Sequence, residues 1–217
     1  MGFEALEREV RQRMTTHELR TSAGLASLHE CGHSKDAVMG ISGLVPIKER
    51  GIWHAKWTIH AFKDRGNRIA RAASRGVPIE ELVEKYQANF LGIKEVEGNL
   101  LLNAGINQIW ALVCGTGGTQ FSAANAYIAV GTSTTAENAT QTALVATGTS
   151  LATATMDAAY PTYGTSQKAI WRSTYGTAVG NFAWNEIAAL NAAAGTLLNR
   201  KVQAMGTKAI GNPQYII

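Results

Sequence analysis

Hydrophobic and polar residues alternate most regularly in the segment WHAKWTIHAF, residues 53–62. The odd-numbered positions from Trp53 to Ala61 carry only Trp, Ala and Ile, and the even-numbered ones from His54 to His60 carry His, Lys and Thr. Successive side chains of a strand point to opposite faces of its sheet. The pattern therefore predicts a half-buried β-strand, and the KDRGNR segment that follows predicts a turn.

Hydrophobic residues recur with the period of an α-helix in three other segments, and each predicts a helix with one apolar side. The first segment begins near the N-terminus, the second covers residues 78–87, and the third covers residues 104–114. Pro78 is suited to the start of the second helix, where two glutamates would interact favourably with the helix dipole. The three apolar sides consist of Phe3, Leu6, Val10 and Met14; Ile79, Leu82, Val83 and Tyr86; and Ile106, Ile109, Trp110 and Val113.

Two stretches differ from these elements. Between the first helix and the first strand the periodicity fades and five glycines interrupt the chain, which predicts an extended arm ordered by its neighbours. After residue 120, short alternating segments separated by polar turns predict several strands. These segments are 126–130, 167–175, 181–187 and 200–205, and the run Ala192–Ala194 is compatible with either a loop or a helix.

Together the patterns predict an α+β fold in two parts. Residues 1–51 are expected to form an N-terminal helix and extended arm. Residues 52–217 are expected to form a mainly antiparallel, β-sandwich-like body with short helices near 78–87 and 104–114.

Charge is distributed unevenly along the chain. The net charge is +4, and 28 of the 36 charged residues lie in the first 100 of the 217 positions. The long polar loop after Val130 has a single charge, at Glu137. Since charge keeps proteins soluble and apart, the C-terminal half is interpreted as a surface for lasting contact with other polypeptides. No apolar run is long enough to cross a membrane, so no membrane partner is expected.

The tightest cluster of metal-ligating side chains is HECGH, with His29, Cys31 and His33. A structural zinc site needs four ligands, and the sequence does not identify the fourth. The alternative, which we favour, is a polar loop with a buried or half-buried cysteine and no metal. The side chains considered as a fourth ligand are His17, His54, His60 and Cys114.

The sequence contains no recognisable catalytic motif. GTGGTQ at 115–120 lacks the Gly-Lys-Ser/Thr ending of a phosphate-binding loop and is better explained as a turn, and burial would explain the neighbouring Cys114. After residue 100 the chain offers only Glu137, Asp157 and Glu186 as carboxylates and has no histidine. We therefore expect that the protein is not an enzyme and that it has neither a cofactor nor catalytic residues.

A basic stretch lies at KDRGNRIARAASR, where a single acid, Asp64, accompanies five bases. Such a cluster would contact phosphates, form a solvated turn, or meet an acidic surface on another subunit. No aromatic residue is interleaved for base stacking, so we favour protein contact over direct nucleic-acid binding. The five bases are Lys63, Arg65, Arg68, Arg71 and Arg75.

Five ordered segments carry a resemblance to known proteins. They are EGNLLLNAGINQIWALVCG, NAYIAVGTSTTAENATQTAL, MDAAYPTYG, FAWNE and LNRKVQAMGTKA. Together, over residues 53–208, they resemble a family of tailed-bacteriophage and prophage virion structural proteins. Members of that family continue into a final Thr-rich strand, whereas this chain has AIGNPQYII. The last strand is therefore expected either to be missing or to pair with another subunit.

The resemblance implies a structural role in the virion, assembled in the bacterial host cytoplasm, without catalysis or cofactor. The most specific expectation is a capsid decoration (cement) protein that binds the major capsid protein or other virion structural proteins as a homo-oligomer, with a trimer expected. The alternatives are a tail or head-fibre component that binds a host receptor or glycan, a tail or connector ring protein, and a virion-borne hydrolase. The aromatic residues considered as contact anchors are Trp53, Tyr160, Tyr163 and Tyr175, although each of them is also compatible with a core position.

Overall fold

The structure is a computed structural model that describes residues 53–209 and 213–216. The helix and arm predicted for residues 1–51 lie outside the described residues. Within them the fold is α+β, and every strand pair is antiparallel, which confirms the predicted class. Across the same ranges, no helix has the length and apolar character needed to span a bilayer.

The first sheet has four strands in the order β2-β1-β11-β8. Their bounds are Phe90–Glu97 for β2, Lys56–Lys63 for β1, Pro213–Ile216 for β11 and Thr174–Tyr175 for β8. The strand near the C-terminus is therefore present, and it pairs with β1 and β8 of its own chain. That result answers the question raised by the unusual C-terminal sequence.

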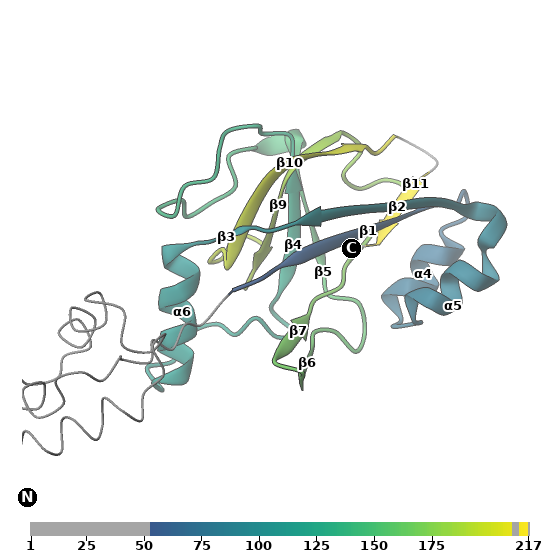
Figure 1. Cartoon of the computed structure of the whole chain (residues 1–217). Coiled ribbons are helices and arrows are strands. Elements are labelled where there is room, and N and C mark those ends of the chain that lie inside the picture. The colour runs from purple at the N-terminus through teal and green to yellow at the C-terminus, as the bar shows by residue number, and fades with distance from the viewer. Residues whose placement is uncertain (1–52, 210–212, 217) are drawn as a thin grey trace, which may run out of the picture. The chain divides into compact units, whose positions relative to one another are not determined.

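The second sheet has five strands in the order β3-β10-β9-β4-β5, with β10, β9 and β4 in its interior (Figure 1). A 3-10 turn, Gly148–Ser150, leads into β5. A bridge between Met156 and Ser173 connects the end of β5 to the residue before β8, so the two sheets are linked along one edge. The bounds are Leu100–Leu101 for β3, Asn199–Thr207 for β10, Ala183–Leu190 for β9, Tyr127–Gly131 for β4 and Leu151–Thr155 for β5.

Both sheets contribute to one hydrophobic core. Trp57 and Ile59 of β1 lie in the same buried cluster as Trp184 and Ile187 of β9. The alternation in the first predicted strand thus places its central residues correctly, whereas Trp53 at its start is 43% exposed. Burial of these large side chains is the main stabilising contribution to the body.

Three α-helices are described. α5 (Ile79–Lys85) lies within the predicted segment 78–87, and α6 (Asn103–Val113) is shifted by one residue from the predicted segment 104–114. α4 (Arg68–Ser74) was not predicted, because the basic stretch was interpreted as a turn. α4 and α5 lie at one end of the body, followed by a 3-10 turn at Gln87–Asn89, and α6 lies at the other end (Figure 1).

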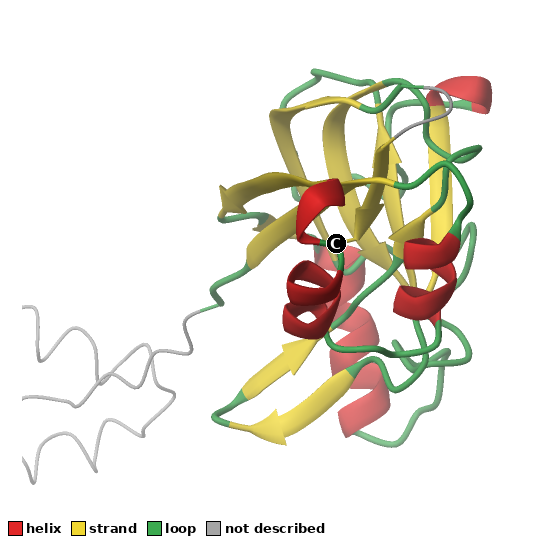
Figure 2. Ribbon diagram, turned by 90° about the vertical axis from the view of Figure 1, so that its right-hand side faces the viewer, coloured by secondary structure: helices red, strands yellow, loops and turns green. Residues whose placement is uncertain are grey.

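A small hairpin completes the fold. β6 (Thr162–Thr165) and β7 (Lys168–Ile170) pair with each other and extend beyond the larger sheets (Figure 2). The strand predicted for residues 167–175 is therefore wrong as one element, since its first part belongs to this hairpin and its last part to β8. The run Ala192–Ala194 forms a turn between β9 and β10.

Candidate interaction surface

Exposed charge is confined almost entirely to one part of the described chain. Every charged side chain between residues 53 and 100 is exposed except Asp64. The eight charged residues after residue 100 all lie within the described ranges, and only Lys168 among them is exposed. The buried ones are Asp157, Arg172, Glu186, Arg200 and Lys208, and the half-buried ones are Glu137 and Lys201.

Glu186 on β9 and Arg200 on β10 form a fully buried ion pair with an N–O distance of 2.7 Å. The carboxylate of Glu186 also accepts hydrogen bonds from the backbone N–H groups of Val145 and Ala146, at 3.2 and 2.7 Å. A buried carboxylate is costly unless its oxygens are fully hydrogen-bonded, and these contacts supply the partners. The pair therefore holds the end of the long polar loop against the sheet.

The guanidinium of Arg200 holds the start of the same loop. It donates to the backbone oxygens of Thr135 and Ala136 and to Oε1 of Gln141. The loop residue Glu137 accepts a hydrogen bond of 2.6 Å from the backbone N–H of Val202. The charges in and under the loop are thus directed inward. Its exposed side chains are uncharged: Thr134, Thr135, Ala136, Asn138, Thr140, Thr142, Ala143, Val145 and Thr147.

A second buried ion pair anchors the β6–β7 hairpin. Arg172 donates to Asp157 at 2.8 Å, and its guanidinium also donates to the backbone oxygens of Ala73 and Val77 near α4 and α5. The central carbon of the guanidinium, Cζ, lies 4.4 Å from the centre of the Tyr160 ring, which is a cation–π contact. Burial raises the pKa of Asp157 although hydrogen bonds from Thr174 and Arg172 oppose the change. The hairpin therefore extends from a rigid base.

That hairpin carries the most exposed aromatic side chain among the described residues, on strand β6. Tyr163 is 79% exposed, and Ile170 is 41% exposed. Tyr163 was one of the aromatic residues expected as contact anchors. Tyr175 was another, but it lies in the core, where its hydroxyl donates to the carbonyl oxygen of Ile128 and burial raises its pKa well above the usual range. Tyr160 is half-buried beneath Arg172.

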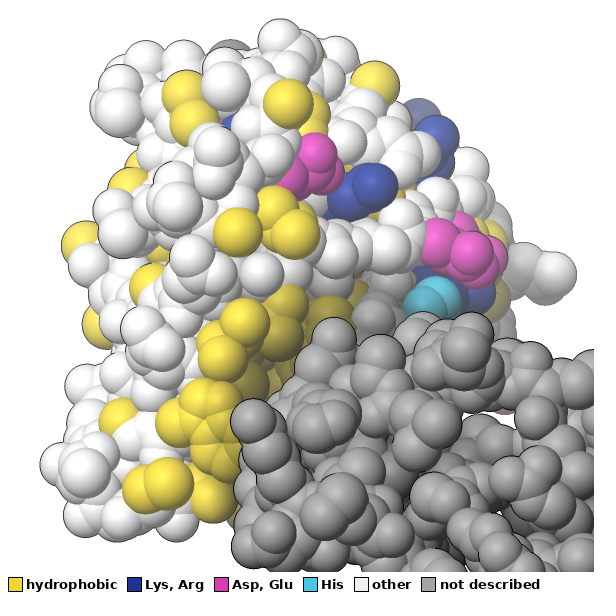
Figure 3. Space-filling model, turned by 60° about the vertical axis from the view of Figure 1, so that its left-hand side comes forward, with side chains coloured by type: hydrophobic (Ala, Val, Ile, Leu, Met, Phe, Trp, Pro, Cys, Tyr) yellow, Lys and Arg dark blue, Asp and Glu magenta, His cyan; other side chains and the backbone are white. Residues whose placement is uncertain are grey.

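Helix α6 exposes a second apolar area. Gly105 lies directly against the backbone of Leu198, and Ile109 packs on the core, so the opposite side of the helix is left outward. There, Trp110 is 60% exposed, and Val113, the last residue of the helix, is 70% exposed. Figure 3 brings the α6 side forward and shows hydrophobic side chains gathered on its lower part. The sequence analysis placed these two residues on the buried side of the helix. Gly105 was the signal that could have corrected it, since a glycine within a helix indicates where a neighbouring backbone approaches.

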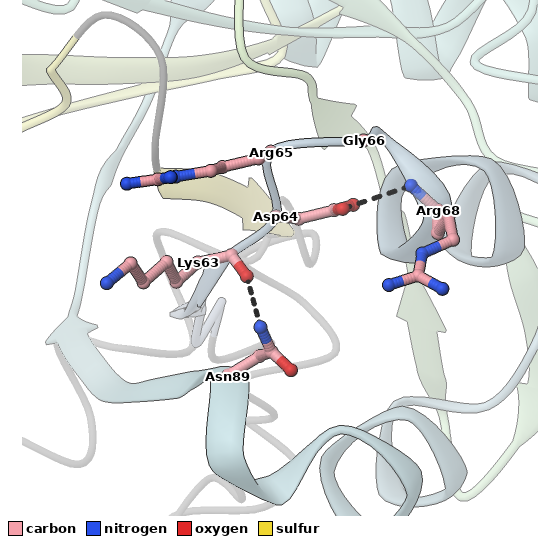
Figure 4. Close-up of a pocket in the computed structure, with 6 residues that line it drawn as sticks. All are labelled: Lys63, Asp64, Arg65, Gly66, Arg68 and Asn89. Atoms are coloured by element: carbon pink, nitrogen blue, oxygen red, sulfur yellow. Dashed lines mark hydrogen bonds between the residues drawn. The ribbon is translucent and has the colours of Figure 1, made fainter.

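The basic stretch contains all of α4, and its first residues line a pocket of about 210 Å³ (Figure 4). The carboxylate of Asp64 accepts hydrogen bonds from the first backbone N–H groups of α4, and the side chains of Lys63 and Arg65 extend away from Arg68. The carbonyl oxygen of Lys63 accepts a hydrogen bond from Asn89. Asp64 thus acts as a helix cap, which explains the single acid in the stretch.

The proposed metal ligands His29, Cys31 and His33, together with His17, lie outside the described residues. His54 is exposed, and His60 is half-buried with a pKa lowered by burial. Cys114 follows α6 and is exposed, so the expectation of a buried cysteine is wrong there. Over the ranges that the structure covers, no group of three potential metal ligands comes together.

Comparisons of the chain with protein families, with curated proteins and with solved structures found no match. Functional assignment therefore depends on the residues and surfaces described above.

Proposed function

We propose that this chain is a structural protein of a bacteriophage virion, and specifically a capsid decoration protein that binds the lattice of the major capsid protein. The observation that carries the proposal is the distribution of exposed charge. After residue 100, Lys168 alone among eight charged side chains is exposed. Charged residues are depleted at the centres of protein interfaces, so this surface is suited to contact with another protein.

The carboxylates support a role without catalysis. Acid–base chemistry requires a carboxyl or imidazole group that can reach a substrate. In the C-terminal half, Glu137 binds the backbone of Val202, while Asp157 and Glu186 are buried in ion pairs with Arg172 and Arg200. Each of the three therefore has a structural use.

The β6–β7 hairpin is the contact that we assign to the capsid. Tyr163 offers a large, amphipathic side chain of the kind enriched at binding hot spots. Ile170 on the neighbouring strand pairs with Thr162, whereas Tyr163 pairs with Ala169, so Ile170 exposes an apolar side chain on the other face of the hairpin. Because Arg172 fixes the base, little conformational freedom is lost on binding. Many copies on one lattice then add weak contacts into a stable assembly. In this role we class the body as a β-sandwich, since both sheets contribute to its core.

The test is the location and number of copies in purified particles of the phage that encodes the chain. A decoration protein is present at a copy number comparable with that of the major capsid protein, and particle images place it on the head. A copy number matching the tail fibres or a single ring would favour those alternatives, and absence from particles would overturn the structural role.

A matched pair of variants tests the hairpin. Tyr163→Ser/Ile170→Ser is expected to reduce occupancy on the head, whereas Leu91→Ser/Ile93→Ser, which removes two exposed apolar side chains of β2, is expected to retain it. Equal occupancy of the two variants would contradict the assignment to the hairpin.

A further inference from the structure

Five exposed basic side chains lie on α4 or close to its ends. The last three of them follow spacings of three and four, so they share one side of the helix, opposite its buried residues. The first two precede the helix and line the pocket described above. We call these five residues the α4 basic face: Lys63, Arg65, Arg68, Arg71 and Arg75.

The α4 basic face forms no ion pair with a carboxylate of the described residues. The ion pairs within those ranges join Lys56 to Glu95, Arg172 to Asp157, and Arg200 to Glu186. Asp64, the acid of the same stretch, is buried, and its carboxylate accepts hydrogen bonds from three backbone N–H groups of α4. Since like charges one turn apart disfavour a helix, a bound anion would stabilise α4.

Helix α4 is fixed at both of its ends. Near its C-terminal end, Arg172 donates to the backbone oxygen of Ala73 at 2.6 Å. At its N-terminal end, the hydroxyl of Thr177 donates to Oδ1 of the N-cap residue Asn67 at 3.2 Å. The α4 basic face is therefore positioned in advance, and little conformational freedom is lost when a partner binds.

The layout of the α4 basic face favours an extended acidic partner over a single small anion. The side chains of Lys63 and Arg65 extend away from Arg68, so these charges do not converge on one point (Figure 4).

A polypeptide fits this layout better than a nucleic acid, whose phosphates continue without interruption along the strand. α5 packs against α4 in a shared hydrophobic cluster, and it exposes acids that would repel phosphates extending beyond the α4 basic face. These acids are Glu80, Glu81 and Glu84. A short acidic segment can end before it reaches them.

We propose that the α4 basic face binds an acidic segment of a second protein, in which several Asp or Glu side chains lie close together. The contact consists of exposed ion pairs. It is separate from the capsid contact, which we assign to the hairpin and the uncharged surface after residue 100. The inference adds a binding partner to the proposed function, and neither depends on the other.

The first experiment measures the binding of a labelled oligo-glutamate peptide to the full-length chain by fluorescence anisotropy. The wild type is expected to bind the peptide, with an affinity that falls between about 0.01 M and 0.15 M salt because exposed charges are screened. Arg68→Gln/Arg71→Gln/Arg75→Gln is expected to lose about tenfold or more in affinity, since three exposed ion pairs are removed. No binding by the wild type at low salt would overturn the proposal.

The matched control removes the same charge from exposed bases elsewhere: Lys85→Gln/Lys94→Gln/Lys168→Gln. Its affinity for the peptide is expected to stay within about twofold of the wild type. Circular dichroism checks that both variants fold. Equal losses in the two variants would overturn the proposal, and so would binding of a DNA duplex more tightly than of the peptide.

A second variant leaves the helix itself unchanged. Lys63→Gln/Arg65→Gln alters only residues that precede α4, and it is expected to weaken peptide binding by a smaller factor than the three arginine substitutions do. An unchanged affinity would contradict the inclusion of these two bases in the site.

The second experiment locates the bound peptide. A carbodiimide joins lysine amines to carboxylates in contact with them, and Lys63 is the lysine of the α4 basic face. Mass spectrometry is expected to find the peptide joined to Lys63, whereas coupling at other lysines alone would overturn the proposal.

The capsid contact is read separately, as occupancy on phage heads. Arg68→Gln/Arg71→Gln/Arg75→Gln is expected to retain occupancy while it loses peptide binding. Loss of occupancy by this variant would place the α4 basic face in the capsid contact and overturn the proposal of a separate partner. Absence of the wild type from particles would remove the proposed function and leave the peptide result unaffected.

Discussion

Buried charge in this protein organises backbone that has no regular hydrogen bonding of its own. Glu186 and Arg200 are both fully buried, and their remaining hydrogen-bonding groups bind the backbone of the loop that joins β4 to β5. An ion pair gains little over a well-packed apolar pair, but the loss of one partner leaves an uncompensated charge. The pair is therefore better understood as a determinant of loop conformation than as a source of net stability.

We predict that Glu186→Ala lowers the free energy of unfolding by about 3–5 kcal/mol, because Arg200 is left buried without its counter-ion. Amide exchange at Val145 and Ala146 should also accelerate, since both amides lose their acceptor. The matched control is Lys56→Ala, which removes an exposed pair with Glu95 and should cause a clearly smaller loss in the same urea titration. Similar losses in the two variants would contradict the role of burial.

Lys208 gives a pH prediction. Its Nζ donates to the backbone oxygen of Gly176 and to Oδ1 of Asn181, both at 2.7 Å, and burial lowers its pKa from 10.5 to about 8. Between these two pH values the unfolded chain binds more protons than the folded chain at this site, so stability rises with pH. Below about pH 8, Lys208 is protonated in both the folded and the unfolded chain, so its contribution to the free energy of unfolding stays at its lower value.

The measurement is the difference in free energy of unfolding between the wild type and Lys208→Met at several pH values. As the pH increases above 8, the free energy of unfolding of the wild type should rise relative to that of Lys208→Met. The exposed Lys168→Met should show a difference that does not vary in this way. A flat profile for Lys208→Met would show that the lysine is not desolvated.

Helix α6 is positioned where its backbone at Gly105 closely approaches the backbone of Leu198. A Cβ atom at Gly105 would collide with the backbone of Leu198, the residue just before β10. We predict that Gly105→Ala destabilises the fold by about 1–3 kcal/mol, although alanine favours an isolated helix by about 1 kcal/mol. Thermal unfolding measures the effect, and the exposed Asn107→Ala serves as the control with no expected loss. A stabilised Gly105→Ala would show that α6 shifts freely on the sheet.

The sequence predicted the elements whose pattern is local. The alternation around Trp57 identified β1, and the spacing from Ile106 to Val113 identified α6. α4 was missed because it has only seven residues, and because Asp64, its capping acid, precedes the helix and lies within a run of bases. The break between β7 and β8 was missed because alternation continues across two half-strands that belong to different sheets.

The candidate surface was predictable only in part. Charge counting indicated that the half after residue 100 has little charge, but not that five of its eight charged side chains are buried and two more are half-buried. That depends on pairs such as Glu186 with Arg200, which are separated along the chain and meet only across neighbouring strands. Likewise, the exposed side of α6 follows from its contact with Leu198 and not from its own period.

For the whole molecule, the separation of exposed charge predicts how binding responds to salt. If the protein binds phage heads through the surface that residues after 100 form, the amount of bound protein should change little between about 0.01 M and 1 M salt. The reason is that this surface has almost no exposed charge to screen. Quantifying bound protein on heads across this range checks the prediction. A steep loss with salt would instead implicate the charged side chains of β1, β2, α4 and α5.

The position of β11 determines when the body can be completed. β11 lies between β8 and β1, so the first strand of the body obtains its neighbour from residues 213–216. A nascent chain on the ribosome therefore exposes one edge of β1 until residues 213–216 have been synthesised. Strand pairing over such a separation is slow, because a long loop must close first. The body can thus be completed only after residues 213–216 have left the ribosome.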